Sequence, residues 1–255
     1  MSATYKSIQL GAFKRPLPLT IKKRMAILSR HLTRPGESFL DCGCGPGDYM
    51  RLLSEKLGMD AFGIEYEQAV VDSIQSDPFL KARVSQGDLQ NLSYADQTWN
   101  HAMLNEVLEH VADERKVLRE IHRILKPGGL LFVFSPNRWF PFETHGVNLK
   151  LTGRRTYWLP FTTYLPVKLG ELFYDSWARN YWQGELKKIL EDAGFAVLER
   201  DYVWSTFENR SGSQPRFFSI LRPALRFISN TAEEIFFVRK FGVSQVFVCQ
   251  KIPSR

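Results

Sequence analysis

Residues 39–50, FLDCGCGPGDYM, place three glycines between an apolar run and the start of an amphipathic segment. Glycines at positions 43, 45 and 47 permit a tight turn and a close backbone approach that a Cβ would block. From residue 48 onward we expect a helix, whose free N–H groups favour negative charge. A strand, a glycine-rich turn and a helix in this order predict a nucleotide-type binding turn, a motif that nucleotide dehydrogenases share.

Outward from this turn, strand-like and helix-like segments alternate between residues 37 and 137. Such alternation predicts an α/β fold with right-handed crossovers and a mostly parallel sheet covered by helices on both faces. Ligands of such sheets lie beyond the carboxyl ends of the strands. The expected strands are SFLDC, DAFGIEY, ARVSQGD, WNHAMLNEV and LLFVFS, and the expected helices are GDYMRLLSEKLG, EQAVVDSIQS and ADERKVLREIHRILK.

Three further segments flank or interrupt the alternation. Residues 1–36 are basic, and residues 21–32 are expected to form an amphipathic helix with basic residues opposite its apolar face. Residues 136–180 hold ten aromatic residues and four prolines, which predicts a lid, a binding element or a satellite core. The regular pattern resumes with QGELKKILEDAGF and AVLERDYVW and ends on the strand SQVFVCQK.

Residues 205–241 form a second insertion. It contains an apolar stripe with two arginines on the other side, although Pro223 argues against a continuous helix. We expect this segment to lie on an anionic membrane surface, to pack on the sheet or to form a dimer contact. The stripe consists of Phe217, Leu221, Leu225 and Ile228, and the arginines are Arg222 and Arg226.

The composition, 44% apolar and 24% charged over 255 residues, predicts an ordinary globular protein. The net charge of +7 is uneven, since residues 1–36 hold eight basic residues and no acid, and residues 200–255 hold nine basic against four acidic residues. These basic ends indicate either an anionic partner or scattered solvated side chains. Three cysteines, no apolar run long enough to span a membrane and no signal peptide favour a cytoplasmic protein, with peripheral membrane contact as an option.

Three acidic residues follow the first three expected strands. Asp41 is placed to accept hydrogen bonds from a cationic amine of a ligand, and Glu65, 24 residues later, to accept both ribose hydroxyls. Asp88 suits an exocyclic adenine amine. An amine, a ribose and an adenine in these places match S-adenosylmethionine rather than a dinucleotide. The intervening Cys42 and Cys44 are expected to be small buried residues.

Several strings together resemble the class I S-adenosylmethionine-dependent methyltransferases, particularly the small-molecule group that resembles enzymes of ubiquinone and menaquinone biosynthesis. The resemblance is close over residues 37–137 and looser at ELKKILEDAGFAVLER and the last strand. It implies one Rossmann-like, doubly wound domain over residues 1–255, with seven strands and the last antiparallel. The strings are DCGCGPG, GIE, QGDLQNL, NEVLEHV and LREIHRILKPGGLLFVFSPNR. By this resemblance the cofactor contacts are Asp41, Gly43, Gly45, Glu65, Asp88, Leu89 and Asn105.

Methyl transfer is an in-line displacement, so the protein mainly holds the acceptor close and excludes water. A base is needed only where the acceptor must lose a proton. The candidate catalytic residues are His110, after the fourth strand, and Glu143 and His145, after the fifth. No metal is expected, although a metal site remains an alternative. Glu106, Glu109 and His110, with His145 as a fourth residue, resemble the metal-ligand string of small-RNA 2′-O-methyltransferases and some quinone O-methyltransferases.

We therefore expect a methyltransferase acting on an oxygen of a small aromatic or lipid-like acceptor. An RNA methyltransferase is the alternative that the basic ends favour, and its affinity would fall steeply with salt. Two more functions stay open, a methyltransferase-fold subunit that binds without turnover and a nicotinamide-dependent dehydrogenase. Nucleic acid is not the expected partner, because no RNA-binding module is recognisable.

Overall fold

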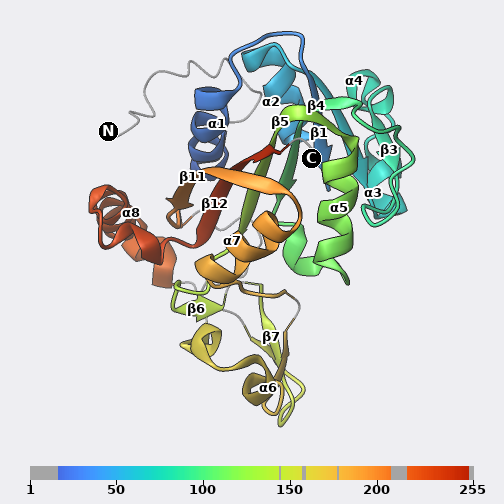
Figure 1. Ribbon diagram of the computed structural model, residues 1–255. Coiled ribbons are helices and arrows are strands. Elements are labelled where there is room, and N and C mark those ends of the chain that lie inside the picture. Colours follow the sequence, from blue (N-terminus) through green and yellow to red (C-terminus); the bar gives the residue numbers. More distant parts are fainter. Residues whose placement is uncertain (1–16, 144, 157–158, 177, 208–216, 253–255) are drawn as a thin grey trace.

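A seven-stranded sheet forms the centre of the molecule in the computed structural model, which describes residues 17–143, 145–156, 159–176, 178–207 and 217–252 (Figure 1). The strand order is β11-β12-β5-β4-β1-β2-β3. The five strands from β5 to β3 pair in parallel, whereas β12 is antiparallel to both of its neighbours. The predicted fold class is thus confirmed. The strand bounds are β1 Ser38–Cys42, β2 Asp60–Glu65, β3 Val84–Gln86, β4 Trp99–Asn105, β5 Leu125–Pro136, β11 Phe195–Val203 and β12 Ser244–Lys251.

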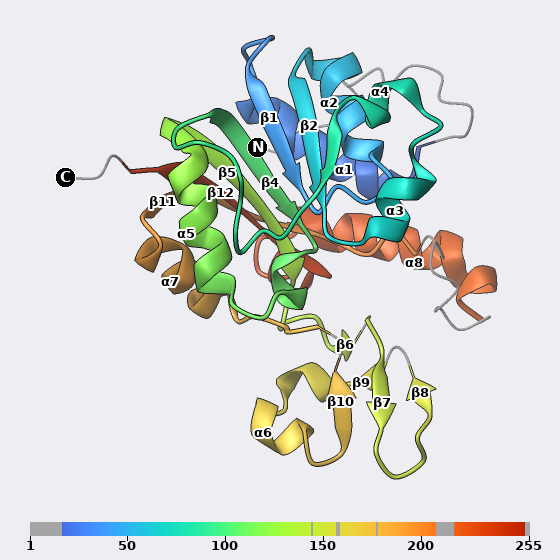
Figure 2. The same ribbon diagram turned by 90° about the vertical axis from the view of Figure 1, so that its right-hand side faces the viewer.

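Helices cover both faces of this sheet. Apolar side chains of α1, α2, α3 and α4 form one buried cluster with one face of the sheet. Apolar side chains of α5 and α7 form a second buried cluster with the other face. Figure 2 shows α5 and α7 on the side of the sheet opposite to α1 and α3. The bounds are α1 Leu19–His31, α2 Asp48–Leu57, α3 Gln68–Ser73, α4 Pro78–Lys81, α5 Glu114–Ile124 and α7 Gln183–Asp192, with the 3-10 helix η1 at Leu108–His110.

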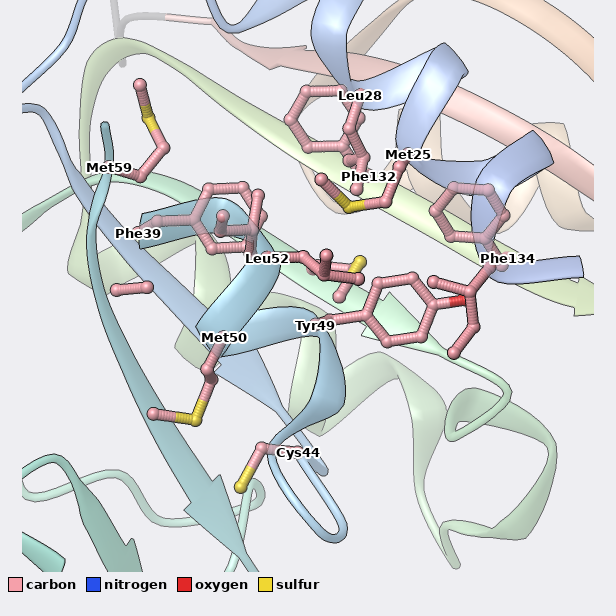
Figure 3. Close-up of a cluster of buried hydrophobic side chains, with 14 of the residues drawn as sticks. Met25, Leu28, Phe39, Cys44, Tyr49, Met50, Leu52, Met59, Phe132 and Phe134 are labelled. Carbon is pink, nitrogen blue, oxygen red and sulfur yellow. The ribbon is translucent and has the colours of Figure 1, made fainter. Parts of the chain in front are cut away.

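The core under α1 and α2 fixes the glycine turn in place. Figure 3 shows Met25 and Leu28 of α1 facing Leu52 of α2 and the strand residues Phe39 and Phe132. All five side chains are fully buried, and each contributes about 1.5–3 kcal/mol by leaving water. Packing against two helices therefore holds the end of β1 and the start of α2 rigidly.

The described cysteines are buried and free, as expected of small core residues. Burial raises the pKa of the Cys42 and Cys249 thiols far above their ordinary value. A thiol in such surroundings stays protonated and is not a nucleophile.

The structure corrects the expected basic face of the first helix. Lys23 and Arg24 are buried, with 1% and 7% exposure, rather than solvated. Lys23 pairs with Glu233, and Arg24 reaches the carboxyl end of β4. Paired, buried cations do not attract an external polyanion, so this helix gives little support to RNA binding. Residues 1–16 of the basic segment lie outside the described part of the chain.

The insertion at 136–180 is not structureless, because it folds into short strands and turns beyond the carboxyl edge of the main sheet. Two of its aromatic side chains, Trp139 and Tyr164, pack against Trp182, which lies just after the insertion. Trp139 lies 5.2 Å from Trp182, and Tyr164 stacks on Trp182 at 6.3 Å between ring centroids. The elements are β6 Phe142–Glu143, β7 Val147–Leu149, β8 Arg155–Thr156, β9 Leu159–Pro160, η2 Thr162–Tyr164, α6 Val167–Gly170 and β10 Tyr174–Ser176.

The second insertion forms the long helix α8, Phe217–Glu234, followed by η3, Arg239–Phe241. The helix continues through Pro223, which corrects the expectation that this proline would interrupt it. The side chain of Phe217 lies outside the described residues. None of the described helices is long and apolar enough to cross a membrane.

Candidate functional site

A cavity of about 560 Å³ lies at the carboxyl ends of the parallel strands, beside the glycine turn. This volume is within the range of about 300–1,000 Å³ that is typical of small-ligand sites. Five of the seven predicted cofactor residues line it. The lining residues are Gly43, Ile64, Glu65, Tyr66, Glu67, Asp88, Leu89, Gln90, Asn105, Glu106, Val107, His110, Val111 and Ala112.

Gly43 is the glycine that the cavity requires. Its φ is +82°, and a Cβ at this position would lie 2.5 Å from Cγ2 of Val107. Its N–H donates to the Ile64 carbonyl at 2.8 Å, which fixes the bare backbone against the end of β2. A side chain here would both strain the turn and push Val107 into the cavity.

Gly45, also predicted as a cofactor contact, links the glycine turn to β2 in the structure. It is not part of the cavity lining, and its N–H donates to Oε2 of Glu65 at 2.9 Å. Oε1 of Glu65 accepts from the backbone N–H groups of Tyr66 and Glu67 at 2.8 and 3.1 Å. A carboxylate has about four acceptor positions. Three of them are occupied here, one by an N–H of the glycine turn and two by N–H groups directly after β2. Glu65 therefore organises the cavity before any ligand arrives.

The floor opposite the turn comes from the loop after β3 and the end of β4. Asp88 Oδ1 accepts from the backbone N–H of Gln90 at 2.8 Å, which shapes the loop that carries Leu89. Leu89 is buried and adds an apolar surface beside this carboxylate. Asn105, at the end of β4, turns its Oδ1 toward the guanidinium of Arg24. An acid beside an apolar wall suits a flat heterocycle with an exocyclic amine.

Asp41 lies outside the lining, two residues before Gly43, and is 1% exposed. Within the described part of the chain, neither of its carboxylate oxygens has a hydrogen-bond partner. Burial, together with the nearby charge of Glu65, raises the pKa of Asp41 to about 7. A buried carboxyl without partners destabilises the free protein. Such a group suits a ligand whose positive end approaches it.

Arg24 is a site residue that the sequence did not reveal. Its guanidinium donates to Asn105, to Glu106 and, at 2.9 Å, to Oγ of Ser244. Burial is the largest influence on Glu106 and opposes its ionisation, but the charges of Arg24 and His145 and the hydrogen bond from Ser244 together outweigh it and lower the pKa of that carboxyl. In the sequence Arg24 is only a basic residue next to the apolar positions of an expected helix, and the side chain of such a residue is more often solvated than buried.

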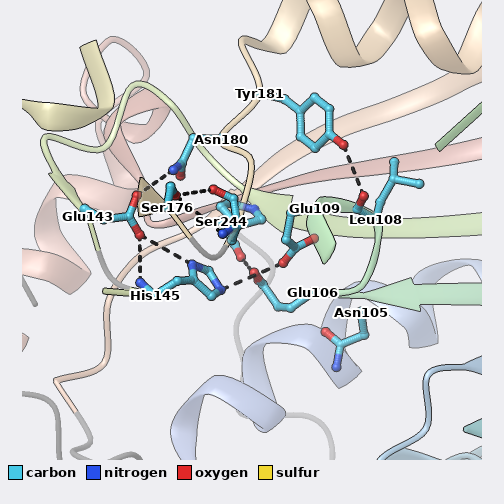
Figure 4. A network of polar contacts seen from close by, with 12 residues as sticks. Asn105, Glu106, Leu108, Glu109, Glu143, His145, Ser176, Asn180, Tyr181 and Ser244 are labelled. Atoms are coloured by element: carbon cyan, nitrogen blue, oxygen red, sulfur yellow. Dashed lines mark hydrogen bonds and ion pairs between the residues drawn. The ribbon is translucent and has the colours of Figure 1, made fainter. Parts of the chain in front are cut away.

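The predicted catalytic residues lie close together, and Figure 4 shows two of them, Glu143 and His145. There the His145 ring lies between two carboxylates, with Nδ1 3.8 Å from Oε1 of Glu143 and Nε2 3.9 Å from Oε1 of Glu109. Glu143 is itself held by the His145 backbone N–H at 2.8 Å and by Nδ2 of Asn180 at 2.7 Å. The His110 ring is 5.4 Å from the His145 ring. We call Glu106, Glu109, His110, Glu143 and His145 the partition cluster.

A second cavity, of about 840 Å³, lies against the insertion on the other side of this cluster. Glu106 and His110 line the first cavity, whereas Glu109 and Glu143 line the second. Most of the residues that line it are polar or charged, although the insertion as a whole is rich in aromatic residues. Its residues are Glu109, Arg138, Glu143, Lys150, Thr162, Thr163, Leu165, Lys168, Glu171, Tyr174, Asp175, Ser176, Ala178, Arg179 and Asn180.

The partition cluster also contains a set of groups suited to a metal ion. One ligand atom each from Glu109, His110 and His145 lies within 4.8 Å of the others. Both oxygens of Glu109 are buried with no hydrogen-bond partner among the described residues. Burial and the neighbouring Glu106 raise the pKa of Glu109 well above its ordinary value. Glu106, the remaining residue of the predicted set, is instead engaged by Arg24 and Ser244.

The fold and the cavity together identify the class of protein, which is an α/β protein of Rossmann-like topology with a ligand site at a glycine turn. Comparison with known families then gives a match of residues 40–133 to a methyltransferase domain. By this match the chain is similar to the class I S-adenosylmethionine-dependent methyltransferases over residues 40–133.

Relatives by sequence are distant. An uncharacterised 37.1 kDa protein of a Streptomyces fradiae transposon is 32% identical over 69% of this chain, but the match spans only 48% of that relative. The demethylmenaquinone methyltransferase of a Geobacillus species is 24% identical over 70% of this chain and 79% of its own length. The matched part thus spans about half of the first relative and most of the second.

Solved structures agree on the fold. A methyltransferase from Mesorhizobium loti superposes with a TM-score of 0.58 at 17% identity, covering 89% of this chain and 97% of that one. The [4+2]-cyclase SpnF gives 0.56 at 21% identity, covering 91% of this chain and 82% of that one. Since a cyclase shares the fold, the reaction must be argued from the site.

Proposed function

We propose that this chain transfers a methyl group from S-adenosylmethionine to an oxygen of a small organic acceptor. The observation that carries the proposal is the cavity beside Gly43, whose walls present Glu65 and Asp88 at the tips of neighbouring strands. The match to the methyltransferase family supports the same cofactor. A dehydrogenase is not favoured, because the matching family is one of methyltransferases.

The residues present fit S-adenosylmethionine. Glu65 would face the ribose hydroxyls, and Asp88 with Leu89 would face the adenine. The carboxyl of Asp41, which lacks a partner among the described groups, would interact with the positive end of the methionine moiety. To accept both ribose hydroxyls, Glu65 must give up its bond from the Gly45 N–H. We therefore expect the glycine turn to adjust when the cofactor binds.

The cofactor supplies an activated methyl group on a sulfonium. The chain's own task is to hold the acceptor oxygen near the partition cluster and to exclude water. His145 would accept the hydroxyl proton, while Glu143, fixed by the His145 N–H and by Asn180, orients its ring. The polar lining of the second cavity favours an acceptor with a polar head group, to which an aromatic or lipid-like tail can be attached.

A second mechanism is favoured by the geometry of Glu109, His110 and His145. Two imidazoles and one carboxylate suit a divalent transition ion such as Zn²⁺ or Mn²⁺, which would polarise a hydroxyl. Glu143 beside Nδ1 of His145 would then be the carboxylate that fixes the ring of a ligating histidine. Cobalt titration distinguishes the mechanisms. A visible spectrum that Glu109→Gln removes would support a metal, and no cobalt binding would leave His145 as a base.

Calorimetry with S-adenosylmethionine, followed by turnover assays on a panel of phenolic and isoprenoid hydroxyl acceptors, tests the proposed function. We expect cofactor binding that Glu65→Ala abolishes and methyl transfer to at least one acceptor. Binding without transfer to any acceptor would favour a non-catalytic subunit. Affinity for RNA that falls steeply with salt would favour an RNA methyltransferase, and binding of a nicotinamide cofactor instead would contradict the proposal.

A further inference from the structure

Helix α8 carries large apolar side chains on its solvent side. Ile220, Phe227 and Phe237 are 82%, 73% and 77% exposed. The spacing of the helical members places them on one outward face, and the chain directly after the helix extends the row. Seven residues form what we call the α8 ridge, namely Ile220, Leu221, Phe227, Ile228, Ile235, Phe236 and Phe237.

Polar contacts on the opposite face hold the helix in this orientation. Oγ of Ser229 donates to the Ser205 carbonyl at 2.7 Å, and Nε of Arg226 donates to the Thr206 carbonyl at 2.8 Å. Farther along, Glu233 pairs with the buried Lys23 of α1. Rotating α8 to bury the ridge would break all three contacts. The exposure of the ridge is thus built into the packing of the helix.

The ridge exceeds what scattered apolar residues contribute to an ordinary surface, so it indicates an interaction surface. In Figures 1 and 2 the helix lies at the periphery, with one side turned away from the sheet. An 18-residue helix is about 27 Å long at about 1.5 Å per residue. This length and the aromatic side chains suit a helix that lies in the interface of a bilayer.

The net charge of the protein indicates which kind of bilayer the ridge would bind. The protein carries a net charge of +7, and residues 200–255 hold nine basic against four acidic residues. Lys240 follows the ridge closely, Arg239 before it pairs with Asp201, and Glu233 beside the ridge is neutralised by Lys23. A net positive charge opposes pairing of two copies and favours a surface of anionic lipid head groups.

We propose that the α8 ridge docks this protein on the surface of an anionic lipid bilayer without crossing it. The described helices contain no candidate membrane span, which agrees with a peripheral position. Docking needs neither the cofactor nor turnover, so it stands or fails independently of the proposed methyl transfer.

Flotation of the full-length protein with vesicles tests the proposal. The vesicles contain phosphatidylcholine, with or without phosphatidylglycerol. We expect binding to the anionic vesicles that is weaker by roughly tenfold or more in the triple variant Phe227→Ser, Phe236→Ser, Phe237→Ser. The matched control is Leu198→Ser, which removes an exposed leucine of β11 and should leave vesicle binding unchanged. Thermal unfolding of both variants checks that they fold.

Three results would overturn the proposal. The first is wild-type protein that stays unbound to the anionic vesicles. The second is a triple variant that folds and floats as well as the wild type. The third is a concentration-dependent dimer that the triple variant abolishes while neither protein binds vesicles, which would assign the ridge to a second copy of the chain.

Discussion

The two cavities on either side of the partition cluster are built in different ways. The cavity beside Gly43 is shaped by hydrogen bonds between neighbours in the sheet, such as those from Gly45, Tyr66 and Glu67 to Glu65. The cavity against the insertion depends on contacts between residues far apart in the chain, such as Asn180 to Glu143. The glycine turn of the first site is thus organised by local motifs, whereas the second site depends on long-range packing. Substrate choice is expected to vary through the second without disturbing the first.

The largest expected effect is a loss of turnover without a loss of cofactor affinity. Replacing His145 by Asn removes the proposed base and is expected to lower turnover by about 10²–10⁴-fold, with cofactor affinity unchanged. Glu143→Gln, which alters only the group that orients the ring, should cost less. Steady-state kinetics on an accepted substrate and calorimetry with the cofactor measure the two quantities.

His31 provides the matched control, because its Nε2 lies 2.8 Å from a carboxylate of Glu199, far from both cavities. His31→Asn should leave turnover unchanged. Equal turnover of His145→Asn and the wild type would show that positioning alone carries the reaction.

The next largest effect concerns the ion pair between Arg24 and Glu106 of the partition cluster. Arg24→Met should destabilise the protein by about 2–3 kcal/mol, between the cost of breaking a surface pair and that of breaking a fully buried one, because it leaves the partly buried Glu106 without its cation. Arg30 lies on the same helix and pairs with Glu199 and Asp201 at the surface, so Arg30→Met should cost less than about 1 kcal/mol. Urea unfolding of both variants measures the difference, and equal losses would contradict a structural role for Arg24.

The contrast between local motifs and long-range packing also explains which features the sequence could predict. The strands, the glycine turn and five of the residues lining the first cavity follow from local patterns, since strand ends and turns are written in neighbouring residues. Arg24 could not be placed in this way, because its burial depends on how α1 packs across the sheet onto the end of β4. The outward direction of the α8 ridge was likewise hidden, since periodicity indicates an apolar face without saying what it contacts.

A smaller effect tests the crowding at the glycine turn. Gly43→Ala should weaken cofactor binding by roughly 100-fold, since the new Cβ must displace Val107 at the cavity wall. Gly36 has nearly the same φ, +84°, but a Cβ there would meet nothing within 4 Å. Gly36→Ala therefore reproduces the backbone strain without the crowding. If both variants bound the cofactor equally well, close approach at Gly43 would not be what the site requires.

The smallest expected effect is the release of a fraction of a proton from Asp41 when the cofactor binds. With the pKa of Asp41 raised to about 7 by burial and by Glu65, about half of this carboxyl is protonated at pH 7 in the free protein. A cationic ligand favours the ionised form and lowers the pKa, so binding should release up to about half a proton at pH 7 and none near pH 9. Affinity should accordingly rise with pH through pH 7 and level off near pH 9.

Calorimetry in two buffers of different ionisation enthalpy measures this release. The ligand's own amine also titrates, but it contributes equally in the Asp41→Asn variant, so the difference between the two proteins isolates Asp41. If the variant does not bind, the wild-type pH profile alone decides. A heat of binding that is independent of the buffer between pH 6 and pH 8 would place the positive end of the ligand away from Asp41, and the first cavity would then hold its ligand in another orientation.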